Sequence, residues 1–206
     1  MKGFKPGAAI ALCVACCAYA SAGGPAPQFK AGGAVLTLPA PRGEFVEVGD
    51  KLRTTLFEVM VPSDNRLVSA YATQSAVTNL LAGKTREGLQ TYGLIEVPRR
   101  AEYADCTPQD FEEIRKNIEP SMRKLGSEGA GSLQDEMNLR LRSLDVGKIE
   151  VGRPEMLGHL FAKTDAFGFA MLVAIKQADR SVTMAVGVGI IRVKQRALFV
   201  YLYRNY

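Results

Sequence analysis

The chain has 206 residues with a formal net charge of +5, and 23% of its residues are charged. Without the two lysines of residues 1–22 the net charge is +3, from 24 basic and 21 acidic residues, which is too small to argue for a protein that binds nucleic acid. Three of the four cysteines, Cys13, Cys16 and Cys17, lie near the N-terminus, which excludes a disulfide framework in the remainder of the chain.

The N-terminus has the pattern of a secretory signal peptide. Lys2 and Lys5 precede an apolar run of small residues at 8–20, and Ala-Ser-Ala ends at Ala22. This order of a basic region, a short apolar core and a small-residue site is typical of exported proteins. The apolar run is shorter than the ~20 residues that a membrane span needs. We therefore predict a signal peptide over residues 1–22, cleavage after Ala22, and a periplasmic or extracellular mature chain without a transmembrane segment.

An alternative for the same segment is a lipoprotein signal in which Cys16 carries the lipid. The residues before it, Cys13-Val14-Ala15, lack the leucine that such signals usually have three places upstream. The alternative function is then a lipid-anchored structural protein, and the mature N-terminus distinguishes the two cases.

Residues 23–33, GGPAPQFKAGG, are rich in Gly, Pro and Ala and are expected to form a flexible linker. A single α+β domain is expected over residues 34–206. Its first part consists of short extended pieces and short helices separated by Pro and Gly. The expected elements are strands at 35–38, 44–48, 66–73 and 89–97, a helix that begins near residue 50, and a helix at 75–81.

The middle of the chain predicts two helices. Thr107 and Pro108 form a good helix start, since threonine caps a helix and proline suits the first turn. Apolar residues recur at helical spacing over residues 111–125, but Pro120 interrupts them and predicts a kink or two shorter helices. A second helix is expected over residues 132–144, after a Gly-rich stretch.

The last sixty residues return to strand-like composition. Short turns separate the segments, so consecutive strands must be antiparallel, because a parallel connection needs a crossover of about a dozen residues or more. An antiparallel sheet with helices packed on it is an α+β fold. The expected strands are residues 148–151, 155–164, 167–177, 182–194 and 197–206.

Both faces of the hairpin formed by the last two strands are apolar. A three-residue loop at 194–196 would pair Gly189 with Tyr201. The same register pairs Gly187 with Tyr203, so that large rings cover both glycines. A sheet with two apolar faces is covered on both sides, as central strands are. The helices in the middle of the chain are expected to cover one face, and another element must cover the second.

Three basic residues, Arg192, Lys194 and Arg196, cluster at the tip of this hairpin. Charges at such tips usually discourage aggregation between sheets. Contact with an anionic partner is the alternative interpretation.

Catalytic residues are not predicted. Cys106 and His159 are the single Cys and His that follow the signal peptide, so a nucleophilic dyad is formally available. Cys106 follows Asp105 in a turn, and His159 alternates with apolar neighbours as a solvent-facing strand residue does. One Cys and one His are too few for a zinc site. We therefore predict no catalytic, cofactor-binding or metal-binding residue, with a thiol- or histidine-dependent hydrolase as the alternative.

Three segments together carry a family resemblance: LTLPAPRGEFVEV, DAFGFAMLVAIK and GVGIIRVKQRALFVYLYRNY. They resemble exported bacterial proteins of unassigned function with the PsbP/Mog1-like α/β sandwich. The resemblance implies a non-catalytic binding or envelope accessory module. Such folds generally continue into a C-terminal helix, and none is expected after Tyr206. This implies either a missing helix or an envelope protein partner on the face of Phe199, Tyr201 and Tyr203.

Overall fold

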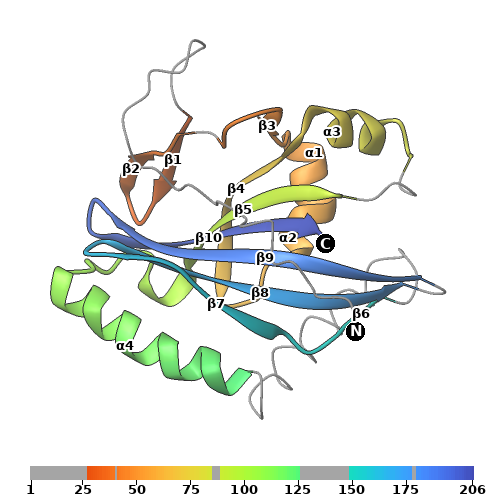
Figure 1. The fold of residues 1–206 in the computed structure, drawn as a ribbon. Coiled ribbons are helices and arrows are strands. Elements are labelled where there is room, and N and C mark those ends of the chain that lie inside the picture. The colour runs from red at the N-terminus through yellow and green to blue at the C-terminus, as the bar shows by residue number, and fades with distance from the viewer. Residues whose placement is uncertain (1–26, 40, 85–88, 126–148, 178–179) are drawn as a thin grey trace, which may run out of the picture.

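The computed structural model describes residues 27–39, 41–84, 89–125, 149–177 and 180–206. These residues form an α+β fold, as the sequence predicts, with helices packed on an antiparallel sheet (Figure 1). The strands are β1 (Gln28–Ala31), β2 (Ala34–Thr37), β3 (Phe45–Glu47), β4 (Asn65–Thr73), β5 (Thr91–Pro98), β6 (Ile149–Val151), β7 (Glu155–Lys163), β8 (Ala166–Gln177), β9 (Arg180–Val193) and β10 (Arg196–Asn205).

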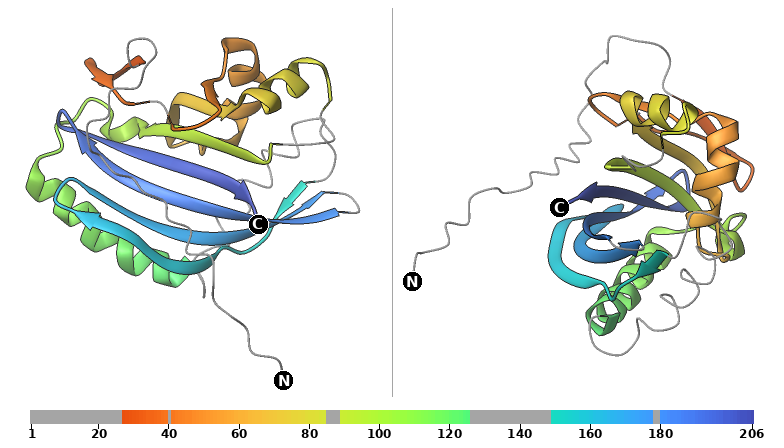
Figure 2. Two further views of the ribbon diagram at one scale, coloured as in Figure 1. Left: turned by 45° about the horizontal axis from the view of Figure 1, so that its top comes forward. Right: turned by 90° about the vertical axis from the view of Figure 1, so that its right-hand side faces the viewer.

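The main sheet has eight strands in the order β3-β4-β5-β10-β9-β8-β6, and β7 also pairs with β8. It curls along its length, as the two views of Figure 2 show. The separate pair β1 and β2 forms a hairpin. The helices are α1 (Asp50–Leu52), the π-helical turn η1 (Arg53–Phe57), α2 (Glu58–Met60), α3 (Gln74–Leu81), the 3-10 turn η3 (Arg99–Ala101) and α4 (Pro108–Leu125).

Helix α4 begins where the sequence predicts. Thr107 and Asp110 form reciprocal hydrogen bonds that cap the helix. The Asp110 N–H donates to Thr107 Oγ1 (3.2 Å), and the Thr107 N–H donates to Asp110 Oδ2 (2.8 Å). The helix is continuous through Pro120, so the alternative of two shorter helices is wrong. A proline removes one backbone hydrogen bond, and here that loss does not end the helix. The helix expected at 132–144 lies outside the described residues, as does the signal peptide at 1–22.

The terminal meander matches its prediction closely. Strands β7, β8, β9 and β10 pair antiparallel in succession, and their ends lie within two residues of the expected ones. Strand β10 is central, since it pairs with β9 on one side and with β5 on the other. The final hairpin is therefore part of the interior of the sheet, as its two apolar faces predict.

The register of that hairpin differs from the prediction. A two-residue turn pairs Val193 with Arg196. Gly189 therefore lies opposite Val200, so the predicted three-residue loop and the glycine–tyrosine pairs are wrong. The turn residues Lys194 (φ 47°) and Gln195 (φ 59°) adopt the left-handed conformation without being Gly or Asn.

Contacts from two other segments hold this turn in place. The Cys106 N–H donates to the Gln195 carbonyl (2.8 Å), and Lys194 Nζ donates to the Val35 carbonyl (2.9 Å). A left-handed residue other than glycine costs roughly 1–2 kcal/mol. These long-range hydrogen bonds help to offset that cost, and the local sequence contains no signal of them.

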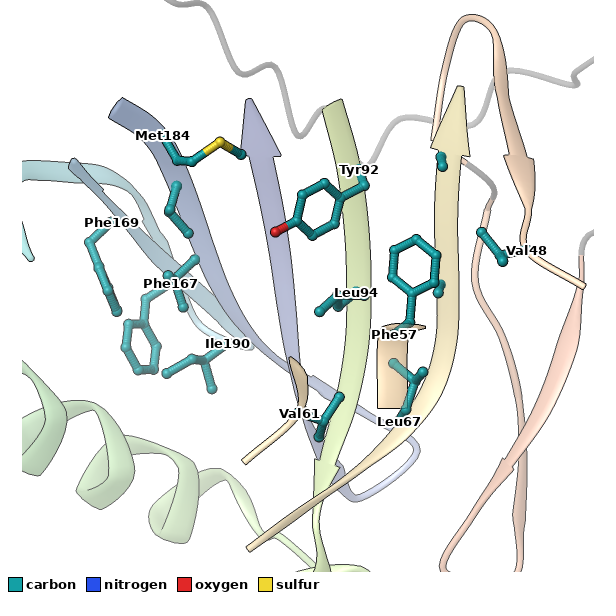
Figure 3. Packing of buried hydrophobic residues seen from close by; sticks show 14 of the residues in the cluster. Val48, Phe57, Val61, Leu67, Tyr92, Leu94, Phe167, Phe169, Met184 and Ile190 are labelled. Atoms are coloured by element: carbon teal, nitrogen blue, oxygen red, sulfur yellow. The ribbon is translucent and has the colours of Figure 1, made fainter. Parts of the chain in front are cut away.

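The first face of the sheet carries the larger core cluster. The segment α1–η1–α2 contributes Phe57, the residue that follows it contributes Val61, and α4 contributes Phe111. Figure 3 shows Phe57 and Val61 near Tyr92 and Leu94 of β5. Two helical segments therefore cover the same face at different strands, one over β4–β5 and one over β8. The buried strand residues of this cluster include Leu67, Tyr92, Leu94, Phe167, Phe169, Met184, Val186, Val188 and Ile190.

The second face is covered by the β1–β2 hairpin. Ala31 and Leu36 are fully buried against Val68, Ile95 and Leu198 of the sheet. The linker predicted over residues 23–33 is therefore wrong where it is described, because β1 belongs to the folded structure. Burial of apolar side chains stabilises this segment despite its glycines, which form the hairpin turn at Gly32 (φ +54°) and Gly33 (φ +78°).

A group of ion pairs and hydrogen bonds connects this hairpin to the rest of the domain. We call it the clasp, and its members are Gly32, Arg66, Glu102, Asp105 and Arg196. Arg66 pairs with Glu102, whose carboxylate also accepts from the Gly32 N–H (3.3 Å). Arg196 pairs with Asp105 (2.5 Å) and donates to the Gly32 carbonyl (3.2 Å). The hydrogen bonds from Arg66 are the main cause that lowers the pKa of Glu102, so the carboxylate is ionised at neutral pH.

The clasp makes Gly32 sensitive to substitution. A Cβ atom at Gly32 would lie 1.6 Å from the carbonyl oxygen of Glu102. We expect Gly32→Ala to lower the free energy of unfolding by about 2–4 kcal/mol, since the hairpin must move off the sheet. Gly33→Ala is the matched control, because that Cβ has no neighbour within 4 Å and only the left-handed backbone is penalised. Urea unfolding measures the stability of both variants. Equal losses of unfolding free energy would contradict a steric collision at Gly32.

Candidate functional site

An aromatic row lies on the first face of the sheet. We define it as Phe199, Tyr201 and Tyr203 of β10 with Tyr92 of β5. The rings of Tyr92 and Tyr203 stack at 4.5 Å between centroids, and those of Tyr201 and Tyr203 are 6.2 Å apart. The rings of Phe199 and Tyr201 are 6.4 Å apart. The structure thus brings together the three β10 residues for which the sequence predicts either cover by a missing helix or contact with a partner.

The row lies between the two helical segments. Phe57 meets the edge of Tyr92 at 5.9 Å, and Phe111 of α4 meets Phe167 of β8 at 5.7 Å. Because β10 lies between β5 and β9, its rings occupy the part of the face between these two contacts. The three β10 rings are half-buried, whereas the neighbouring side chains of β9 are buried; those are Met184, Val186, Val188 and Ile190.

A buried carboxyl group lies beside the row. Glu96 of β5 is directly opposite Phe199 of β10 and is 1% exposed. Asn65 Nδ2 donates to Glu96 Oε2 at 2.8 Å. Burial raises the pKa of Glu96 to about 7, and the hydrogen bond from Asn65 lowers it by a smaller amount. Glu96 therefore changes charge close to neutral pH, beside the aromatic row.

The tyrosines of the row keep their hydroxyl protons under ordinary conditions. Burial raises the pKa of Tyr92 and Tyr201 well above the usual value, and that of Tyr203 as well. The negative charge of Glu96 adds to the effect on Tyr201 and Tyr203. The row is therefore electrically neutral, and the charge of Glu96 beside it varies with pH near neutrality.

Cys106 and His159 lie in different surroundings. Cys106 is 7% exposed and belongs to the first core cluster, and burial raises the pKa of its thiol. A buried thiol with a raised pKa is a poor nucleophile at neutral pH. His159 is exposed on β7, where it lies opposite Phe169. The described contacts therefore place neither residue in the arrangement that a nucleophilic dyad requires.

The three cations at the tip of the final hairpin have partners within the chain. Arg192 pairs with Asp165 at 2.6 Å, and Arg196 belongs to the clasp. Lys194 donates to the Val35 carbonyl. These side chains therefore stabilise turns within the chain, a role that the local sequence does not indicate.

Metal ligands do not gather in the part of the chain that the structure describes: no three His, Cys, Asp or Glu side chains there are placed to hold an ion. In the same residues, no helix combines the length and the apolar character needed to cross a membrane.

No protein-family model matches the sequence, and no curated protein matches it. Among solved structures, the chain is similar to the Ran-binding protein Mog1p of Saccharomyces cerevisiae, with 12% sequence identity and a TM-score of 0.29. The similarity covers 85% of this chain and 74% of that chain. A likeness this low carries no inference about function, so the PsbP/Mog1-like resemblance stays a prediction, and the α+β class rests on the sheet and helices themselves.

The pKa of Glu96 predicts how stability depends on pH. Because the folded-state pKa (about 7) exceeds the ordinary value (4.5), the neutral carboxyl group favours folding fully below pH 4.5, and this contribution is lost as pH rises through 7. We expect Glu96→Gln, which keeps an acceptor for Asn65, to be more stable than the wild type at pH 8 by up to about 3 kcal/mol.

The same comparison at pH 4.5 should show little difference between Glu96→Gln and the wild type. Glu44→Gln, which removes one carboxylate from an exposed position, is the matched control for the loss of a charge. Urea unfolding at the two pH values measures the effect. If the free energy of unfolding of the wild type does not decrease from pH 4.5 to pH 8, the raised pKa is not that of Glu96.

Proposed function

We propose that the chain is an exported, non-catalytic binding module whose aromatic row receives a protein partner in the cell envelope. The observation that carries the proposal is the half-buried state of Phe199, Tyr201 and Tyr203 on a central strand. Aromatic side chains are enriched where proteins bind one another, because a rigid ring offers a large contact area at a small entropic cost.

The geometry of the row favours a protein over a small ligand. Residues 199, 201 and 203 alternate along one strand, so the row spans roughly 13 Å at about 3.3 Å per residue. Small-molecule sites are concave and bury most of the ligand surface. A linear series of rings on a sheet instead fits an extended series of apolar side chains, such as one face of a partner's helix or strand.

Export is the second part of the proposal and rests on the order of features in residues 1–22. The start of β1 at Gln28 leaves only residues 23–27 between the expected cleavage site and the folded hairpin. The hydrolase alternative receives no support from the burial of Cys106 or from the exposure of His159. We therefore do not extend the proposal to catalysis.

Site-specific crosslinking in cells tests the proposed contact. Replacing Tyr201 by the photoreactive residue p-benzoylphenylalanine keeps an aromatic ring at the centre of the row. We expect illumination to attach a second protein to the chain at this position. Leu157 on β7, which is 52% exposed, is the matched control outside the row and should give no such adduct. Identical adducts at both positions, or none at Tyr201, would rule out a partner on the row.

The mass and N-terminal sequence of the chain recovered from producing cells test export. Cleavage after Ala22 predicts a free N-terminus at Gly23. An acylated Cys16 would instead establish the lipid-anchored alternative. An intact Met1 in the recovered chain would contradict both, while leaving the result of the crosslinking experiment unaffected.

A further inference from the structure

One end of the domain gathers five chain segments. The turn at 194–195 meets the loop at 102–106 through the hydrogen bond from Cys106 to Gln195. The Arg99 N–H donates to the Asp64 carbonyl, and the Arg192 N–H donates to the Asp165 carbonyl, each at 2.8 Å. Figure 1 shows the turns of β1–β2, β7–β8 and β9–β10 at this same end of the sheet. We call this surface the basic end; its segments are residues 30–35, 62–66, 99–106, 163–165 and 192–196.

Three ion pairs at the basic end cancel their own charges. Arg66 pairs with Glu102, Arg192 with Asp165, and Arg196 with Asp105. In each pair the cation is less exposed than a free surface side chain, with side-chain exposures of 32%, 18% and 12% for the three arginines. The charges of these arginines are therefore neutralised within the chain. The remaining charges determine which ligands the basic end attracts.

The remaining charges are five cations and one carboxylate, Asp64. The end therefore carries a net charge of +4, which exceeds the +3 that the whole chain carries after residue 22, with 24 basic and 21 acidic residues. The rest of that chain is consequently close to neutral. All five cations are exposed; they are Lys30, Arg99, Arg100, Lys163 and Lys194.

Two exposed apolar side chains accompany these cations. Tyr103 is 78% exposed in the loop that follows Arg100, and Val35 is 42% exposed on β2, beside the hydrogen bond that Lys194 makes. Exposed tyrosine surrounded by lysine and arginine is typical of surfaces that meet lipid headgroups, where the ring lies at the boundary between apolar chains and water.

We propose that the basic end binds the surface of an anionic lipid membrane. The five cations come from four chain segments, so they suit a distributed negative surface better than a single phosphate ion. This inference uses residues outside the aromatic row, so the row stays available to a partner while the domain lies on the membrane. The predicted export would place the domain beside such a membrane.

Electrostatic binding of this kind is weak and reversible. Each basic residue near an anionic bilayer increases binding by roughly five-fold, and the effect extends only about one Debye length, ~8–10 Å in physiological salt. Removal of three exposed cations should therefore reduce binding by about 100-fold. Raising the salt concentration to 0.5 M should also weaken binding of the wild type, because salt screens the charges.

Co-sedimentation with vesicles tests the proposal, using the chain as purified from the cells that produce it. The probes are vesicles of phosphatidylcholine with and without phosphatidylglycerol. The test variant combines Lys30→Gln, Arg100→Gln and Lys163→Gln. The matched control combines Lys51→Gln, Lys84→Gln and Lys176→Gln, which removes the same charge from exposed positions outside the basic end. Circular dichroism and thermal unfolding confirm that both variants are folded.

We expect the wild type to prefer the anionic vesicles, the test variant to lose about 100-fold of that preference, and the control to lose much less. Tyr103→Ser should reduce binding further without changing its dependence on salt. Equal binding to both kinds of vesicle, or equal losses in the two triple variants, would overturn the proposal. Retention by polyglutamate without binding to vesicles would also overturn it and would indicate an acidic protein partner instead.

Discussion

The insertion of β10 between β5 and β9 is the constraint on which the rest of the structure depends. Without that strand, the pairs β4–β5 and β8–β9 would each end on an open edge. The residues of the first core cluster would then be divided between the two pairs. The insertion also creates the candidate site, because it sets Phe199 opposite Glu96 and Tyr203 opposite Tyr92. A core closed by contacts this distant in sequence is expected to fold more slowly than one formed by local pairs.

Local sequence signals predicted the elements of the fold better than their long-range relations. Alternating apolar residues and short turns placed the terminal strands, and the Thr107-Pro108 start placed α4. The turn at Lys194–Gln195 could not be predicted, because its left-handed backbone is supported by Cys106, which is remote in sequence. Strand β1 was missed for a related reason: the glycines that flank it indicate flexibility, and its stability comes from burial of Ala31 and Leu36 on the second face.

The candidate site was predictable only in part. Alternation along β10 identified Phe199, Tyr201 and Tyr203 as one face, and the structure confirms that they lie together. Glu96 was missed, because a charged residue between Ile95 and Val97 in a strand suggests a solvent-facing position. Its burial is possible because Asn65, which starts β4, donates a hydrogen bond to it. A relation of this kind depends on which strands pair, and the sequence contains no local signal of that pairing.

The position of β10 also determines when the domain is able to fold. Every other strand of the sheet precedes it along the chain, yet it occupies the middle of the sheet. A growing chain that lacks residues 196–205 has two unjoined pieces, and neither encloses the first core cluster. The strand that joins the two pieces therefore emerges after the strands that it joins. For the export proposed here, this order delays completion of the sheet until the β10 segment has been made, so most of the chain can enter a narrow protein-conducting channel before the domain closes.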